Sequence, residues 1–160
     1  MVNQLFVPGE PKRYTAQLTM LQFETVNAIL IVAGESPSVL ELADGKLDGE
    51  VRQRNPIGSG KPNSELLTEN IVIVQLPLNT DSDDAALASA ETWLTRNRTA
   101  LLECDACMTL EFQTYLKPEF GSCILTIPNS LVQIAAELQL NIANQAIRLL
   151  TEDECAKLKQ

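Results

Sequence analysis

Two cysteines separated by two residues form the most reactive pattern in this sequence. Cys104 and Cys107 enclose Asp105 and Ala106. Two thiolates at this spacing can hold a soft metal ion or form a redox disulfide, and Cys123 could supply a third sulfur ligand. A zinc ribbon needs two such pairs, however, and a thiol that follows a helix faces the negative end of its dipole. We therefore interpret the pair as small apolar residues at a helix–strand junction, with a thiol or metal site as the alternative.

The acidic residues gather in clusters that could bind a basic protein. The two clusters comprise Asp44, Asp48 and Glu50, and Asp81, Asp83 and Asp84. Carboxylate pairs also serve glycosidases, but that catalysis requires two carboxyl groups across a cleft with separated pKa values. The second cluster also lies where a helix is predicted to begin, a position at which the helix dipole favours negative charge. We interpret both clusters as candidate partner-binding residues.

Composition excludes several chemistries. None of the 160 residues is histidine, which removes imidazole general bases, Ser-His-Asp and Cys-His constellations and metal sites with a histidine ligand. The segment Gly58-Ser59-Gly60-Lys61 resembles a phosphate-binding loop. That motif needs glycine where Asn55 stands and Ser or Thr where Pro62 stands, so we interpret the segment as a flexible turn. The sequence predicts no cofactor.

The net charge of −9 bears on the choice of partner. An acidic surface repels phosphate and anionic lipid and attracts basic proteins, so we expect a protein partner and neither nucleic acid nor membrane. The sequence contains no run of about 18 apolar residues, so no transmembrane helix is predicted. Four cysteines without an export signal predict reduced thiols in the cytoplasm.

Hydrophobic periodicity predicts the elements that must position these residues. Strands are expected at 14–20, 71–74, 108–116, 122–127 and 141–149, with an extended segment at 38–42. Helices are expected at 24–33, at 83–102 and from Pro128 onward, although 24–33 could instead form a buried strand. The strand at 71–74 is continuously apolar, which predicts cover on both of its faces. Residues 43–69 are expected to form a long loop with a short strand near Val51.

These elements predict a single α+β domain over residues 14–150, preceded by an arm at 1–13 and followed by a charged tail at 151–160. Several strands follow one another directly, which favours a mainly antiparallel sheet with about three helices packed on one face. A ferredoxin-like arrangement is the more specific expectation. Trp93 is expected in the core; if exposed, it could anchor an interface or self-association.

Several segments within about residues 14–149 together resemble a small bacterial family known as domain of unknown function 4279. They are Ser36-Pro37, Asn70 to Leu76, Ile127-Pro128-Asn129-Ser130-Leu131-Val132 and Ala135-Ala136-Glu137-Leu138-Gln139-Leu140. Gln139 stands where glycine is expected, and the central strand lacks the expected tryptophan. The resemblance implies an α+β domain without established enzymatic activity, and some relatives are suggested to be immunity proteins against secreted toxins. The leading hypothesis is therefore a non-enzymatic acidic binding module, and its more specific form is a toxin-neutralising, immunity-type protein of bacterial origin.

Overall fold

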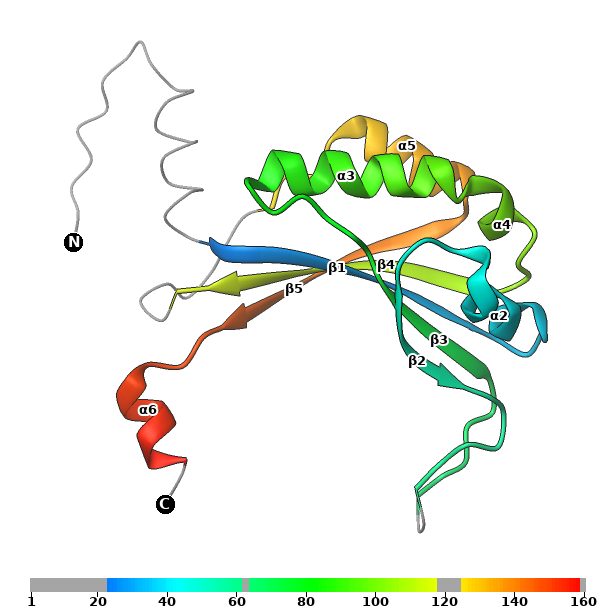
Figure 1. Cartoon of the computed structure of the whole chain (residues 1–160), viewed down its shortest axis with the longest axis horizontal. Helices are drawn as coiled ribbons and strands as arrows, with labels where there is room; N and C mark the ends of the chain where they lie inside the picture. The colour runs from blue at the N-terminus through cyan, green and yellow to red at the C-terminus, as the bar shows by residue number, and fades with distance from the viewer. Residues whose placement is uncertain (1–22, 62–63, 118–124, 159–160) are drawn as a thin grey trace.

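The computed structural model describes residues 23–61, 64–117 and 125–158. Five strands and five α-helices form within these ranges (Figure 1). The strands are β1 (Phe23–Gly34), β2 (Glu50–Asn55), β3 (Asn70–Gln75), β4 (Cys107–Leu116) and β5 (Leu140–Arg148). The helices are α2 (Ser38–Glu41), α3 (Asp83–Arg96), α4 (Arg98–Leu102), α5 (Asn129–Glu137) and α6 (Glu152–Lys157), and a short π-helical turn, η1 (Leu42–Lys46), follows α2.

The strands form one sheet in the order β2-β3-β1-β4-β5. β1 pairs antiparallel with β3 and β4, β2 pairs antiparallel with β3, and β4 and β5 are parallel neighbours. The expected α+β class and mostly antiparallel sheet are confirmed. The ferredoxin-like arrangement is not confirmed, because three strands precede the first long helix, whereas that arrangement alternates as βαββαβ. The described residues contain five α-helices where about three were expected.

The segment 24–33, predicted as a helix, is part of the central strand β1. Its backbone pairs with β3 from Ile29 to Gly34 and with β4 over nearly its whole length. β-branched residues such as Val26 and Val32 lose rotamer freedom in a helix and suit a pleated sheet. The helical spacing of the apolar residues was misleading, because every second residue from Val26 to Val32 is buried.

The long helix predicted at 83–102 is present but interrupted. Ser82 caps α3, since its hydroxyl accepts a hydrogen bond from the Ala85 N–H at 3.1 Å. α3 ends at Arg96, and Asn97 separates it from α4. The Asn97 side-chain amide donates to the Trp93 carbonyl at 2.9 Å. The Asn97 backbone N–H also donates to that carbonyl, at 3.0 Å, so the helical hydrogen bond is kept there. The helix breaks at Asn97 because its backbone, with φ of −93° and ψ of 6°, departs from helical geometry.

Other segments differ from expectation in smaller ways. Residues 38–42, expected to be extended, form α2 and the first residue of η1, and the buried Val39 of α2 joins the core. The loop predicted at 43–69 contains most of η1 as well as β2, and β2 confirms the short strand near Val51. Residues 125–127 have no regular structure, and the rest of the strand expected at 122–127 lies outside the described residues, as do the strand at 14–20 and the arm at 1–13. Within the tail predicted at 151–160, residues Glu152–Lys157 form α6, and 159–160 lie outside the described residues.

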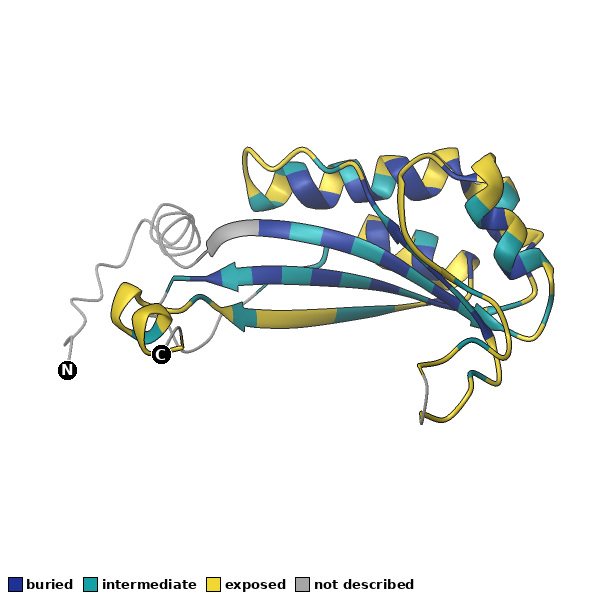
Figure 2. Ribbon diagram, turned by 60° about the horizontal axis from the view of Figure 1, so that its bottom comes forward, coloured by how far each residue is buried: buried dark blue, intermediate teal, exposed yellow. Residues whose placement is uncertain are grey.

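Alternation along the central strands divides the sheet into two faces. α3 and α5 pack on one of them, which we call the covered face (Figure 2). Its buried side chains include Val26, Ala28, Leu30, Val32, Val72, Val74, Met108, Leu110 and Phe112. The side chains between them point to the opposite side, which we call the open face, and they are half-buried. The cover on both faces predicted for 71–74 is therefore wrong within the described residues.

Candidate binding surface on the open face of the sheet

The centre of the open face is apolar. Ile31 of β1 lies opposite Ile73 of β3, and Ala33 lies opposite Ile71. Ile29 continues the apolar row along β1. We call Ile29, Ile31, Ile71 and Ile73 the isoleucine patch. Each of its side chains is half-buried by neighbouring strands, and no helix in the described parts of the chain packs over them.

Polar side chains flank the isoleucine patch on both sides. β4 presents Thr109, Glu111, Gln113 and Tyr115, all half-buried, and the Gln113 amide donates to Glu111 Oε1 at 3.0 Å. On the other flank, exposed Gln53 of β2 is the register partner of Ile73. An apolar centre inside a rim of hydrogen-bonding groups is the usual anatomy of a protein–protein interface.

The first acidic cluster is largely neutralised by the chain's own arginines. The three pairs are Asp44 with Arg54 Nε at 3.4 Å, Asp48 with Arg96 Nη1 at 3.4 Å, and Glu50 with Arg52 Nη1 at 3.2 Å. These side chains are exposed, so each pair contributes little to stability, but each offsets the negative charge that a basic partner would need.

Asp48 has a structural role that the sequence did not reveal. The Trp93 indole N–H donates to the Asp48 carbonyl oxygen, and the Asp48 N–H donates to Asn97 Oδ1 at 3.2 Å. Together with the Arg96 ion pair, these bonds hold the segment before β2 against the C-terminal end of α3. The Asp48 main chain is therefore a structural anchor, and Trp93 is a buried core residue with 2% exposure. The expectation that Trp93 lies in the core is therefore confirmed, and the alternative of an exposed interface anchor is wrong.

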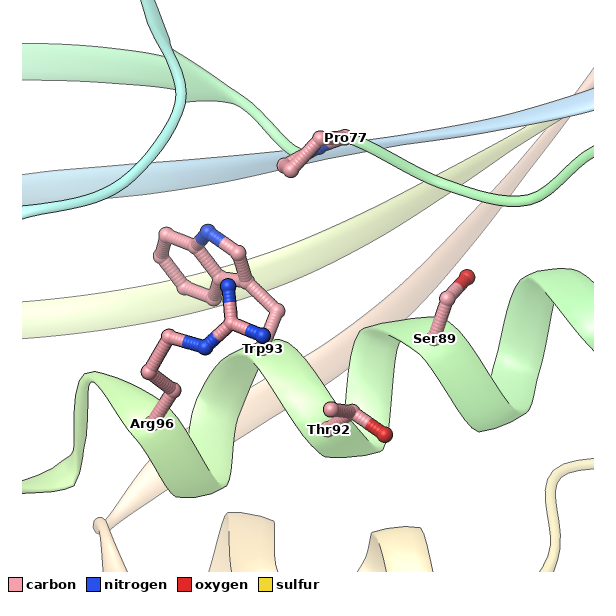
Figure 3. Close-up of a pocket in the computed structure, with 5 residues that line it drawn as sticks. All are labelled: Pro77, Ser89, Thr92, Trp93 and Arg96. Carbon is pink, nitrogen blue, oxygen red and sulfur yellow. The ribbon is translucent and has the colours of Figure 1, made fainter.

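A small pocket lies beside this anchor. It has a volume of about 170 Å³ and is lined by Pro77, Ser89, Thr92, Trp93 and Arg96. Trp93 and Arg96 project from α3 toward Pro77 (Figure 3). Ligand sites usually occupy about 300–1,000 Å³, so this pocket does not favour a small-molecule substrate.

The second acidic cluster lies at the N-terminal end of α3. Asp83 and Asp84 occupy the first turn of the helix, and Asp81 precedes the Ser82 cap. No described lysine or arginine forms an ion pair with these three residues. Burial, and to a smaller extent the charge of Asp84, raises the pKa of Asp83, whose buried Oδ2 has no hydrogen-bond partner among the described residues.

The structure does not bring the two acidic clusters together. One lies at the beginning of α3, whereas Asp48 contacts Arg96 in its last turn. A helix of 14 residues spans about 20 Å at 1.5 Å per residue. A partner would have to cover most of the helical layer to contact both clusters, so they do not form one binding site.

The described cysteines differ in how far they are buried. Cys104 is buried, with Sγ 3.7 Å from Ser38 Oγ, and its burial raises the pKa of the thiol. Cys107 is exposed at the margin of the open face, and Cys155 is exposed on α6. These three thiols are free, and no three potential ligands among the described residues are grouped to hold a metal ion. Cys123 lies outside the described residues.

Comparisons with protein-family models, curated proteins and solved structures find no significant match. In the described ranges, no helix combines the length and apolar character that crossing a bilayer requires.

The isoleucine patch is the functional candidate that sequence reasoning missed. The continuous apolar runs 28–32 and 71–74 suggested elements buried on every side. The available signal was the difference between neighbours: small or medium residues such as Ala28 and Val72 alternate with larger Ile29 and Ile73. That signal is weak, because periodicity alone cannot distinguish a strand that is covered on both faces from a strand with one apolar face that a second molecule covers.

Proposed function

We propose that this chain is a non-enzymatic protein-binding module that binds its partner on the open face of the sheet. The observation that carries the proposal is the isoleucine patch, which lies half-exposed at the centre of the sheet between polar strands. An antiparallel sheet that faces water on one side usually carries polar residues there. Apolar residues at its centre favour a surface that a second molecule covers.

The energetics of burial support this assignment. Complete burial of an isoleucine side chain contributes about 1.5–3 kcal/mol relative to full exposure, and part of that remains to be gained at each patch residue. The amide and hydroxyl groups of Gln113 and Thr109 at the rim can bond to a partner's backbone. These groups favour a partner with an apolar centre and hydrogen-bonding margins.

Charge supports a basic partner. Six basic side chains of the described chain already face a carboxylate, whereas Asp81, Asp83 and Asp84 have no such ion pair there. With a net charge of −9, the field of the whole molecule steers basic proteins toward it and accelerates association at low salt. The charge therefore sets the approach of the partner, and the isoleucine patch supplies the contact.

A finer form of the proposal is that the partner is a basic toxin which this chain neutralises. Its support is the resemblance to an immunity-type family together with the acidic net charge. The absence of histidine from the sequence supports a binding role over imidazole-based catalysis. The free thiols of Cys104, Cys107 and Cys155 support action in a reducing compartment such as the cytoplasm.

The proposal is tested by co-expression with the products of neighbouring genes, followed by affinity measurement with any retained protein. The double variant Ile31→Thr/Ile73→Thr keeps β-branched residues in both strands but removes apolar surface from the patch. We expect it to bind at least about tenfold more weakly. Val132→Thr is the matched control, because Val132 is an exposed aliphatic residue of α5 in the helical layer. Equal affinities for the double variant and the wild type would remove the open face as the binding site.

Thiol protection provides a second readout of the same complex. Cys107 is exposed at the margin of the open face, whereas Cys155 is exposed on α6. A partner on the open face should slow alkylation of Cys107 and leave Cys155 unchanged. Protection of Cys155 alone would place the partner elsewhere.

A further inference from the structure

The two edge strands of the sheet differ in their protection against pairing. β2 has six residues, includes Glu50, Arg52 and Arg54, and has a register shift against β3 between Val51 and Gln53. Charges, bulges and short length are the devices that proteins use to keep a sheet edge from pairing with another chain. β5 has nine residues, pairs in continuous register with β4, and contains no charge or proline from Leu140 to Ile147.

The outer edge of β5 offers regularly spaced backbone groups. The Leu149 N–H donates to the Leu116 carbonyl oxygen at 3.0 Å, which fixes the direction of the backbone groups along β5. In a parallel pair, alternate residues direct both N–H and C=O toward the same neighbour. Residues 141, 143, 145 and 147 therefore face β4, and Ile142, Asn144 and Ala146 direct their backbone groups outward.

The surroundings leave this edge accessible. Asn144, Gln145 and Ala146 are exposed, and β5 pairs with β4 alone among the described strands (Figure 2). α6 lies beyond the C-terminal end of β5 and does not run alongside the strand (Figure 1). This edge is distinct from the isoleucine patch, which lies on β1 and β3.

We propose that β5 pairs antiparallel with β5 of a second copy of this chain, about a two-fold axis at Asn144. In this register Asn144 faces the partner's Asn144, and Ile142 faces the partner's Ala146. All of these residues have outward backbone groups, so each facing pair can exchange two hydrogen bonds. The inference goes beyond the proposed function, because it concerns self-association without the other partner.

A second copy is favoured over a different strand because the edge is self-complementary. Two chains of net charge −9 repel each other, and an uncharged strand is the part of the sheet edge where their close approach opposes no like charges. An isologous two-fold contact closes with two copies, which prevents open-ended assembly. The product is a continuous ten-stranded sheet with both helical layers on one side and both isoleucine patches on the other.

Charge substitution at the axis tests the register. Static light scattering on the full chain should give a dimer for the wild type and monomers for both Asn144→Asp and Asn144→Lys, because each variant places like charges opposite each other. An equimolar mixture of the two variants should restore a dimer, since Asp then faces Lys. Gln53→Asp and Gln53→Lys, on the exposed edge strand β2, are the matched controls and should remain dimeric.

Each other outcome overturns the proposal. A monomeric wild type would remove the dimer, and dimers that survive in both Asn144 variants would remove β5 as the contact. Loss of the dimer in only one charge variant, or a mixture that stays monomeric, would remove the two-fold register. If a variant fails to fold by circular dichroism, hydrogen exchange on the wild type decides. The amides of Ile142, Asn144 and Ala146 should then be protected at high protein concentration and exchange rapidly on dilution; amides unprotected at both concentrations would contradict the proposal.

Discussion

The covered and open faces of the sheet are built from the same strands but differ in what they require of each residue. On β1, Leu30 is completely buried beneath the helical layer, whereas its neighbour Ile31 is half-buried and faces away from it. On β3, Val72 and Ile73 show the same contrast. The larger side chain lies on the open face in the second pair. Side-chain size and hydrophobicity therefore do not determine which face is covered; the positions of α3 and α5 do.

This difference separates stability from recognition. A residue on the covered face is packed on all sides, so its loss leaves a cavity. A residue on the open face loses only part of its contacts on truncation, because water already reaches it. The open face can therefore vary in sequence to suit a partner at little cost to folding, whereas the covered face cannot.

The largest expected effect comes from truncating neighbours that point to opposite faces. Leu30→Ala should lower the free energy of unfolding by about 2–5 kcal/mol, because it leaves a cavity under the helices. Ile31→Ala should cost at most about 2 kcal/mol, because the side chain is already partly hydrated. Urea denaturation followed by circular dichroism measures both. Equal losses would mean that the open face is covered in solution.

An intermediate effect is expected at Gly49, where the segment before β2 passes close to the backbone of β3. Gly49 has φ of +143°, and a Cβ there would lie 2.8 Å from the Gln75 carbonyl oxygen and from Val74 Cγ1. Gly49→Ala should therefore cost about 1–3 kcal/mol through backbone strain and the clash with β3. Gly45→Ala is the matched control, because Gly45 also has positive φ but has no atom within 4 Å of the added Cβ. Thermal unfolding should rank Gly49→Ala below Gly45→Ala, and the reverse order would show that close packing against β3 is not what requires glycine.

The third comparison concerns the alkylation rates of two cysteines, and we expect its effect on stability to be the smallest. Cys107 lies exposed at the margin of the open face and should be alkylated rapidly, whereas buried Cys104 should react slowly. Burial raises the pKa of Cys104, so its alkylation should need a higher pH in the folded protein than in the urea-unfolded chain. The folded protein holds the Cys104 thiol proton more tightly than the unfolded chain does. The free energy of unfolding therefore decreases as the pH rises from the pKa of this thiol in the unfolded chain to its higher pKa in the folded protein. Peptide mapping after alkylation at several pH values measures both rates, and similar rates at the two sites would show that the core around Cys104 opens readily.

Much of the fold could be predicted from local signals. Strand alternation at Met108–Leu116, the start of α3 at residue 83 and the start of α5 after Pro128 depend on neighbours in sequence, and the structure confirms them. The error at 24–33 arose because β1 is central and pairs on both edges. Its apolar residues on the two faces together mimic a helical stripe, and only the position of the strand within the sheet separates them.

The candidate site was harder to predict, because the exposure of the isoleucine patch and the pairing of the acidic clusters depend on where distant segments pack in the fold. The acidic clusters were visible in the sequence, but their neutralisation was not, since Asp48 finds Arg96 across 48 positions of chain. The isoleucine patch was hidden for a related reason. Ile31 and Ile73 look like core residues in sequence, and only the placement of both long helices on the other face leaves them accessible.

Asn97 links the length of a helix to the position of a strand. Its carboxamide donates to the last turns of α3 and accepts from Asp48, 49 residues earlier in the chain. A contact between such distant positions closes a long loop, and most of that entropic cost falls on whichever bond forms first. The Trp93 indole and the Arg96 guanidinium bond to the same Asp48, so once any one of the three contacts has formed, the other two close no further loop. The three contacts to Asp48 together restrain two segments that lie far apart in the chain, and they do so without a covalent bond, since the described cysteines are all free.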